Sequence, residues 1–275
     1  MRPTSGRSSL RNNRSFTVGS LIIACFVIAP GVRARGYQSV LFPQLSLQSS
    51  DDLSSEISTL TKRLRSSDEE ERREATLKLS ALLTPAAIPA LTVGLSDTSE
   101  RVRAAAATGL GYIGDPSSIA TLVARIAQER KSPFMRKTIA YALGEFHTQE
   151  ATAALVALLK DKDVEVRSAA AVALAQYNDA TAIESLIAAL NDKSDFVRAH
   201  AARALGVNGR SAAHAVSRLT RSLATDPDNE VRRQSAVALG LIGEPSAIAA
   251  LERAEQSNDP YLSHAARNAI KMIQR

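Results

Sequence analysis

The sequence of 275 residues contains no tryptophan, one cysteine and few tyrosines or phenylalanines. Because aromatic residues make up 4% of the chain, a core cannot rely on bulky rings and must form between helices that approach closely. A single cysteine excludes an intramolecular disulfide and a metal site with several thiolate ligands. Alanine and leucine are abundant instead, a composition that favours an all-α fold.

The first 34 residues resemble a bacterial secretory signal peptide. Four arginines precede an apolar run from Val18 to Ala29, and Val32 and Ala34 provide small residues at the minus-three and minus-one positions of a cleavage site. The run has 12 residues, whereas a membrane-spanning helix needs about 20. We therefore expect cleavage after Ala34 and export to the periplasm or the extracellular space, with no membrane span in the mature chain.

Two alternatives to this cleavage remain open. Residues 22–25 (Ile-Ile-Ala-Cys) resemble the site at which bacterial lipoproteins are cut and acylated, which makes Cys25 a candidate lipidation site. Residues 26–29 continue the apolar run, whereas a mature lipoprotein usually begins with polar residues, so the sequence favours the first interpretation. In the other alternative, the N-terminal segment stays uncleaved and anchors the protein in a membrane.

The basic charge of the chain is concentrated in this N-terminal segment. Residues 1–34 carry five arginines and no acidic residue, so their removal leaves 29 basic and 28 acidic side chains. A nearly neutral chain without tryptophan lacks the basic surface and the aromatic groups that helical-repeat DNA glycosylases need. We therefore expect no nucleic-acid partner. Cleavage would also remove Cys25, and with it the chain's one thiol.

A repeat occupies most of the remaining chain. Residues 35–50 have no sustained period and several Ser and Gln, which predicts a flexible leader, whereas residues 51–275 repeat the pattern D-x(4)-V-R-x-x-A-x-x-A-L-G-x-I-G. This pattern is followed by Asp or Glu, then by Pro, and then by a second apolar stretch. The leucine of A-L-G recurs at steps of 31 to 34 residues, at Leu79, Leu110, Leu143, Leu174, Leu205 and Leu239, with Ile270 in the same place. Such periods are typical of stacked helix pairs.

Each repeat contains two amphipathic helices. Apolar residues recur at helical spacing from Val102 to Leu110 and again from Ile119 to Ile126. Between the two helices, Gly114 is a suitable end for the first, while Asp115 and Pro116 suit the start of the second.

The ends of the repeat region each show half of this unit. Residues 52–65 resemble a second helix without its first, and residues 260–273 resemble a first helix without its second. The sequence therefore predicts an all-α, right-handed α-solenoid with six full helix pairs and a half-repeat at each end, about 14 helices in all, with the terminal helices acting as caps.

The repeat motif resembles the HEAT-like repeats named after phycobilisome lyase subunits, and the resemblance covers nearly all of residues 66–273. In HEAT-type repeats an Asp and an Arg six positions apart form a ladder between neighbouring units. The resemblance therefore implies four ladder pairs, Asp97/Arg103, Asp161/Arg167, Asp192/Arg198 and Asp226/Arg232. The third unit departs from this pattern, with Arg130 where Asp is expected before Arg136 and two extra residues nearby that we interpret as a loop insertion.

We find no catalytic, cofactor-binding or metal-binding residues in the sequence. The di-iron deoxyhypusine hydroxylases share this type of repeat and carry His-Glu pairs as metal ligands, but none of the four histidines here is followed by Glu. The G-x-G-x-x-G spelling from Gly109 to Gly114 ends a helix and lacks the preceding strand of a dinucleotide site. The sequence therefore favours a non-catalytic adaptor or scaffold without a cofactor, with a lyase-type or monooxygenase-type enzyme as the alternative.

The resemblance also implies a concave face lined by the second helix of each pair. The outward positions of these helices are mostly small in the first four repeats and basic in the last two. The candidate partner-binding residues are Thr121, Ala154, Ser185, Arg218, Arg221 and Arg253. We interpret them as a groove for a protein or peptide with an acidic segment; the alternative is that the alanines only favour helix and the arginines pair with Glu252 and Glu255.

Overall fold

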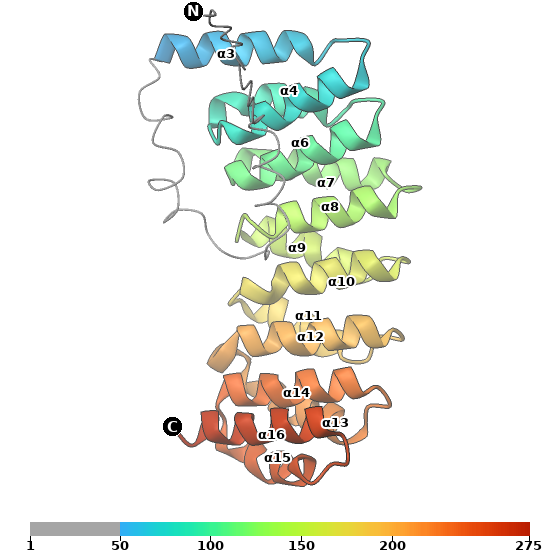
Figure 1. Ribbon diagram of the computed structural model, residues 1–275, viewed down its shortest axis with the longest axis vertical. Helices are drawn as coiled ribbons and strands as arrows, with labels where there is room; N and C mark the ends of the chain where they lie inside the picture. Colours follow the sequence, from blue (N-terminus) through green and yellow to red (C-terminus); the bar gives the residue numbers. More distant parts are fainter. Residues whose placement is uncertain (1–49) are drawn as a thin grey trace, which may run out of the picture. The chain divides into compact units, whose positions relative to one another are not determined.

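The structure is a computed structural model that describes residues 50–275, which form 14 α-helices and no strand (Figure 1). The predicted signal peptide, with Cys25 and the cleavage site after Ala34, lies outside the described residues, as does the predicted leader up to residue 49. Ser50, the last residue assigned to that leader, begins the helix α3. No helix among the described residues is long and apolar enough to span a membrane.

The helices form six consecutive pairs between two unpaired helices, which confirms the predicted all-α solenoid. The first helices are α4 (Glu69–Ala81), α6 (Glu100–Ile113), α8 (Pro133–Leu143), α10 (Val164–Ala173), α12 (Asp195–Val207), α14 (Asn229–Ile242) and the unpaired α16 (Pro260–Ile273). The second helices are the unpaired α3 (Ser50–Arg63), then α5 (Ile88–Gly94), α7 (Ile119–Gln128), α9 (Gln149–Leu158), α11 (Ala180–Ala189), α13 (Val216–Thr225) and α15 (Ile248–Glu255).

Terminal residues set the helix boundaries. Gly114 ends α6 in the left-handed conformation, with a φ of 66° that glycine adopts without strain. The Asp115 side chain then accepts a hydrogen bond from the amide of Ser117, and Pro116 opens a short 3-10 turn that leads into α7. The predicted end and start are confirmed, with the 3-10 turn as an addition.

The leucine of every A-L-G element is buried. Leu79, Leu110, Leu143, Leu174, Leu205 and Leu239 are all 0% exposed. They belong to one hydrophobic cluster that runs through the stack from Leu60 to Ala269. Because each pair buries its apolar surface against the pairs beside it, the stability of the solenoid comes from contacts between neighbouring repeats.

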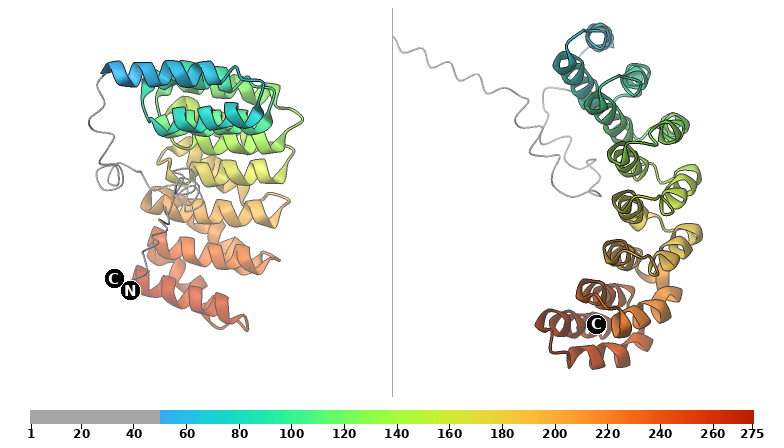
Figure 2. Two further views of the ribbon diagram at one scale, coloured as in Figure 1. Left: turned by 45° about the horizontal axis from the view of Figure 1, so that its top comes forward. Right: turned by 90° about the vertical axis from the view of Figure 1, so that its right-hand side faces the viewer.

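The stack curves, with the first helices on the inside and the second helices on the outside (Figure 2). Neighbouring first helices pack against one another along the whole stack, whereas neighbouring second helices make few contacts. Glycine permits the close approach, since a Cβ atom built on Gly111 of α6 would lie 2.8 Å from the Cα atom of Ala142 in α8. The prediction that second helices line the concave face is therefore wrong, because the small residues that bring helices closest belong to the first helices.

Candidate functional site

A ladder of ion pairs crosses the boundaries between repeats near the start of each first helix. In every rung, an arginine donates two hydrogen bonds to a carboxylate of the following repeat. The Nε atom lies 2.7 to 2.8 Å from its acceptor oxygen in the rungs Arg72–Asp97, Arg103–Glu129, Arg136–Asp161, Arg167–Asp192 and Arg198–Asp226. The ladder that the resemblance implies is present.

The pairing within the ladder differs from the prediction. Asp192 accepts hydrogen bonds from Arg167 of the preceding repeat, at 2.8 and 2.9 Å, and not from the side chain of Arg198. Arg198 binds only the main-chain carbonyl of Asp192, at 3.0 Å, and gives its remaining hydrogen bonds to Asp226. The within-repeat side-chain pairing of Asp192 with Arg198 is therefore wrong, because each arginine reaches forward to the next repeat.

The same forward shift corrects the other predicted pairs. Asp97 and Asp161 bind arginines that the prediction left unpaired, namely Arg72 and Arg136. The predicted partners Arg103, Arg167 and Arg198 reach to the next repeat, and Asp226 is taken by Arg198. Arg232 is the last ladder arginine, and its Nε atom donates to the carbonyl of Leu223 at 3.1 Å.

Glu129 completes the rung in the repeat that lacks the expected aspartate. Its side chain is 6% exposed and accepts hydrogen bonds from Arg103 at 2.7 Å and from Arg125 at 2.6 and 2.8 Å. The sequence analysis missed this residue because it compared Arg130 with the aspartate position. The longer side chain of a glutamate one residue earlier reaches the same arginine, so the two extra residues leave the ladder intact.

The electrostatics of the ladder fit a structural role. Burial raises the pKa of the Asp192 carboxyl, but hydrogen bonds from Arg167 and from the Ser194 amide lower it by more, so the pKa lies below its usual value. The pKa shifts in the same way at the other ladder carboxylates. Burial raises each pKa and hydrogen bonds, chiefly from arginine, lower it by more, so the pKa lies below its usual value at Asp97, Glu129, Asp161 and Asp226. These carboxylates stay charged and saturated with hydrogen bonds, which leaves them unsuited to acid or base catalysis.

The structure separates the predicted partner-binding residues into two sets. Thr121, Ala154 and Ser185 are half-buried, and Arg218 is half-buried with its Nη2 atom 2.7 Å from Oδ1 of Asn191. Arg221 on α13 and Arg253 on α15 are exposed, but these helices lie on the outside of the curve (Figure 2). The six residues therefore do not line a concave groove.

The inside of the curve carries the exposed apolar side chains instead. Of the 13 large hydrophobic residues that are exposed among those described, ten belong to first helices. They include all five exposed aromatic residues: Tyr112, Phe134, Tyr141, Phe196 and Tyr261. The second helices contribute only Val93 and Val123 to this set. An apolar surface concentrated on one side of a solenoid is typical of an interaction face.

Four of these residues form a group at the C-terminal end, which we call the inner strip: Val207 on α12, Val237 and Leu241 on α14, and Met272 on α16. Between 39% and 53% of each residue is exposed. A Cβ atom built on Gly206 of α12 would lie 3.2 Å from Leu241, and one built on Gly240 of α14 would lie 3.4 Å from the sulfur of Met272. Leu241 and Met272 thus each cover a glycine of the preceding first helix, which links the strip residues of α14 to α12 and those of α16 to α14.

The side chains that could bind a metal or act in catalysis are dispersed. No group of three or more His, Cys, Asp or Glu residues within residues 50–275 is placed to hold a metal ion. His200 bonds through Nδ1 to Ser168 of the preceding first helix, and His214 lies 3.0 Å from Glu184 of the preceding pair. Burial raises the pKa of Tyr177 to about 12, and its hydroxyl donates a hydrogen bond to the carbonyl of Leu143. This phenol is therefore a structural link between repeats.

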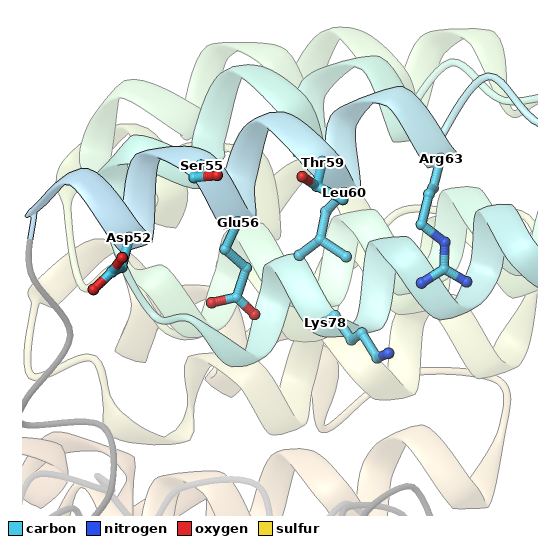
Figure 3. Close-up of a pocket in the computed structure, with 7 residues that line it drawn as sticks. All are labelled: Asp52, Ser55, Glu56, Thr59, Leu60, Arg63 and Lys78. Carbon is cyan, nitrogen blue, oxygen red and sulfur yellow. The ribbon is translucent and has the colours of Figure 1, made fainter.

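A polar hollow lies between α3 and α4 (Figure 3). It is lined along one face of α3 by Asp52, Ser55, Glu56 and Thr59, and by Lys78 from α4. Within the stack, the equivalent place beside α5 and α6 is filled by the first helix α4, which contacts both. The hollow therefore occupies the place of a first helix, and its polar lining is typical of a solenoid cap rather than of an active site.

Comparison with known proteins agrees with this geometry. A family model described as HEAT repeats matches residues 57–134, 126–206 and 184–271. No curated protein matches the chain. The fold is similar to that of YibA of Escherichia coli, with 19% identity, a TM-score of 0.57 and coverage of 99% of this chain and 100% of that one.

Two further solved structures are similar. An engineered protein has 26% identity and a TM-score of 0.50, with coverage of 80% of this chain and 68% of that chain. The complex of CpcE and CpcF of phycocyanin lyase from Nostoc sp. PCC7120 has 23% identity and a TM-score of 0.49, with coverage of 79% and 94%.

Proposed function

The chain belongs to the HEAT-repeat family, and we propose that it is an exported, non-catalytic adaptor that binds a protein or peptide partner along the inner face of its solenoid. The observation that carries the proposal is the concentration of exposed apolar and aromatic side chains on the first helices. Exposed aromatic residues on a rigid surface are typical anchors of protein interfaces.

The fold itself does not require these side chains. At the repeat position of Leu241, two other repeats carry the polar residues Glu145 and Gln176. Since the repeat tolerates polar residues at this position, apolar ones there lower solubility without adding to the core. A binding role accounts for them, and the curved stack supplies the extended surface that solenoid proteins use for partners.

Site-specific photo-crosslinking tests which face of the solenoid binds the partner. A photoreactive phenylalanine analogue replaces Tyr141, which is 41% exposed on the first helix α8, and in a second variant Val93, which is 56% exposed on the second helix α5. We expect the variant at position 141 to form a covalent adduct of defined mass in the native compartment and the variant at position 93 to form none. Adducts at position 93 alone would contradict the inner-face proposal and favour the outer face.

Export is the second part of the proposal and rests on residues 1–34, where arginines precede a short apolar run and a Val-x-Ala site. Sequencing the N-terminus of the mature protein should give Arg35. Intact Met1 on protein recovered from the cytoplasm would contradict export. Acylated Cys25 would replace the proposal with the lipoprotein alternative.

A further inference from the structure

The inner strip is a local feature and not a product of the repeat. Leu241 and Met272 occupy one repeat position on α14 and α16, and Val207 occupies it on α12. The two repeats immediately before α12 carry Glu145 and Gln176 there, and α6 carries Tyr112. An apolar surface on three consecutive first helices therefore marks one end of the inner face as different from its middle.

Arg203 adds a positive charge to this surface. It is exposed and lies one helical turn before Val207 on α12, so both side chains project to the same side of the helix. Several other arginines of the first helices are neutralised, as Arg73 is by Glu70 and Arg233 by Glu230. Within the described part of the chain, Arg203 forms no ion pair.

The acidic groups near the strip are already engaged. Glu230 of α14 binds Arg233 and Gln234, and α16 contains no acidic residue. His200, one turn before Arg203, is half-buried, and burial together with the nearby Arg203 lowers its pKa. At neutral pH the strip therefore presents one uncompensated guanidinium within an apolar surface.

We propose that the inner strip and Arg203 bind a linear segment of a partner protein that carries both apolar and carboxylate side chains. The inference rests on the proposed function and narrows it to one end of the inner face and one partner chemistry. The apolar side chains of the segment pack on Val207, Leu241 and Met272, and a carboxylate accepts two hydrogen bonds from Arg203. Arginine suits this contact because its planar fork binds a carboxylate in bidentate fashion while its stem packs on apolar groups.

Two synthetic peptides test the inference. One contains leucine and glutamate in an amphipathic helical order, and the other has lysine in place of every glutamate. A length of about 20 residues is suitable, because such a helix spans about 30 Å and crosses three helices spaced about 10 Å apart. Fluorescence anisotropy with the full chain should show binding of the glutamate peptide that weakens as salt is added, and at least tenfold weaker binding of the lysine peptide.

Charge reversal at matched positions locates the site. Arg203→Glu should weaken binding of the glutamate peptide at least tenfold, whereas Arg221→Glu, an equal charge change at an exposed residue of the outer helix α13, should leave it unchanged. Leu241→Gln should weaken binding of the peptide without altering the circular dichroism spectrum.

Three results would overturn the inference: equal binding of the two peptides, equal effects of Arg203→Glu and Arg221→Glu, or no binding of the glutamate peptide. If photo-crosslinking at position 141 still gives an adduct in any of these cases, the proposed function stands with a partner of different chemistry. If that adduct is also absent, the proposed function fails together with the inference.

Discussion

Each ladder arginine holds two repeats together through two kinds of bond. Arg167 donates from Nη1 to the main-chain carbonyl of Asp161 in its own repeat, and from Nε and Nη2 to the carboxylate of Asp192 in the next. Its side chain is 6% exposed. A guanidinium buried to this extent is costly to leave without its carboxylate, since desolvation is no longer offset.

The first prediction concerns this rung. Asp192→Asn should lower the free energy of unfolding by about 3 kcal/mol, because it leaves Arg167 buried without a counter-charge. Urea unfolding measures the loss. Glu150→Gln is the control, because Glu150 is an exposed carboxylate in the first turn of α9 and forms no ion pair among the described residues. It should change stability by less than about 0.5 kcal/mol.

A double-mutant cycle separates the observed pairing from the one expected from sequence. Asp192→Asn combined with Arg167→Met should show a coupling energy of about 2 kcal/mol, and combined with Arg198→Met a coupling below about 0.5 kcal/mol. The reverse order would contradict the geometry of the ladder.

The ladder shows what sequence spacing can and cannot give at the residue scale. The recurring residues identified the Asp and Arg positions, but Asp192 lies six residues from Arg198 and 25 residues from its true partner Arg167. Only the stacking of one repeat on the next brings the distant pair together. Glu129 was missed for a related reason, since a comparison by position cannot measure how far a longer side chain reaches.

At the scale of the helix, small residues decide the curvature. Gly111, Gly206 and Gly240 each face the backbone of an alanine on the next first helix, and a Cβ atom there would lie 2.7 to 2.8 Å from its Cα atom. At these three glycines a side chain is therefore excluded by the neighbouring helix and not by the helix that carries the glycine.

Gly111→Ala should accordingly destabilise the solenoid by about 1–3 kcal/mol, because α6 and α8 must separate to admit the methyl group. Thermal and urea unfolding measure the loss. The control is Ala175→Gly, at the same position of another repeat, which should cost about 1 kcal/mol or less because it creates no clash. A larger loss for the control than for Gly111→Ala would show that helix propensity, and not close approach, governs this position.

The sequence predicted where the helices lie along the chain, but it did not predict which helices form the concave face. Residues 260–273 were expected to form a first helix, and α16 spans Pro260–Ile273. The concave face was assigned to the second helices, although the A-L-G element places the small residues on the first helices. Periodicity reports which side of a helix is buried, whereas curvature depends on how closely the helices of neighbouring repeats approach. That distance follows from contacts such as Gly111 on Ala142.

At the scale of the whole solenoid, the two unpaired helices are complementary. A second copy stacked end to end would place its α3 beside α16 of the first, and together they would form a seventh pair. The residues that would meet in this arrangement oppose it. Lys271 of α16 occupies the repeat position of Gly240, and Lys78 of α4 occupies that of Gly109, so stacking would bring two ammonium groups together where a glycine and a small residue meet elsewhere.

We therefore predict that Lys78→Ala combined with Lys271→Ala promotes end-to-end association. Ala175 shows that alanine fits at the second of these positions. Sedimentation velocity should give a coefficient that rises with protein concentration for the double variant, because the like-charge contact is removed. Lys78→Arg with Lys271→Arg keeps both charges and should behave as the unaltered chain. Identical profiles for all three proteins would show that the lysines do not limit association.

The unequal packing of the two helix layers also gives the molecule the mechanics of a layered beam. The inner layer resists extension, because glycine contacts and the ion-pair ladder tie each first helix to the next. The outer layer is compliant, because neighbouring second helices make few contacts. Such a beam bends about its stiff layer, so the spacing between successive inner side chains stays constant while the outer helices spread or close. A partner would then meet inner side chains at a constant spacing, on a surface whose curvature adapts to the shape of the partner.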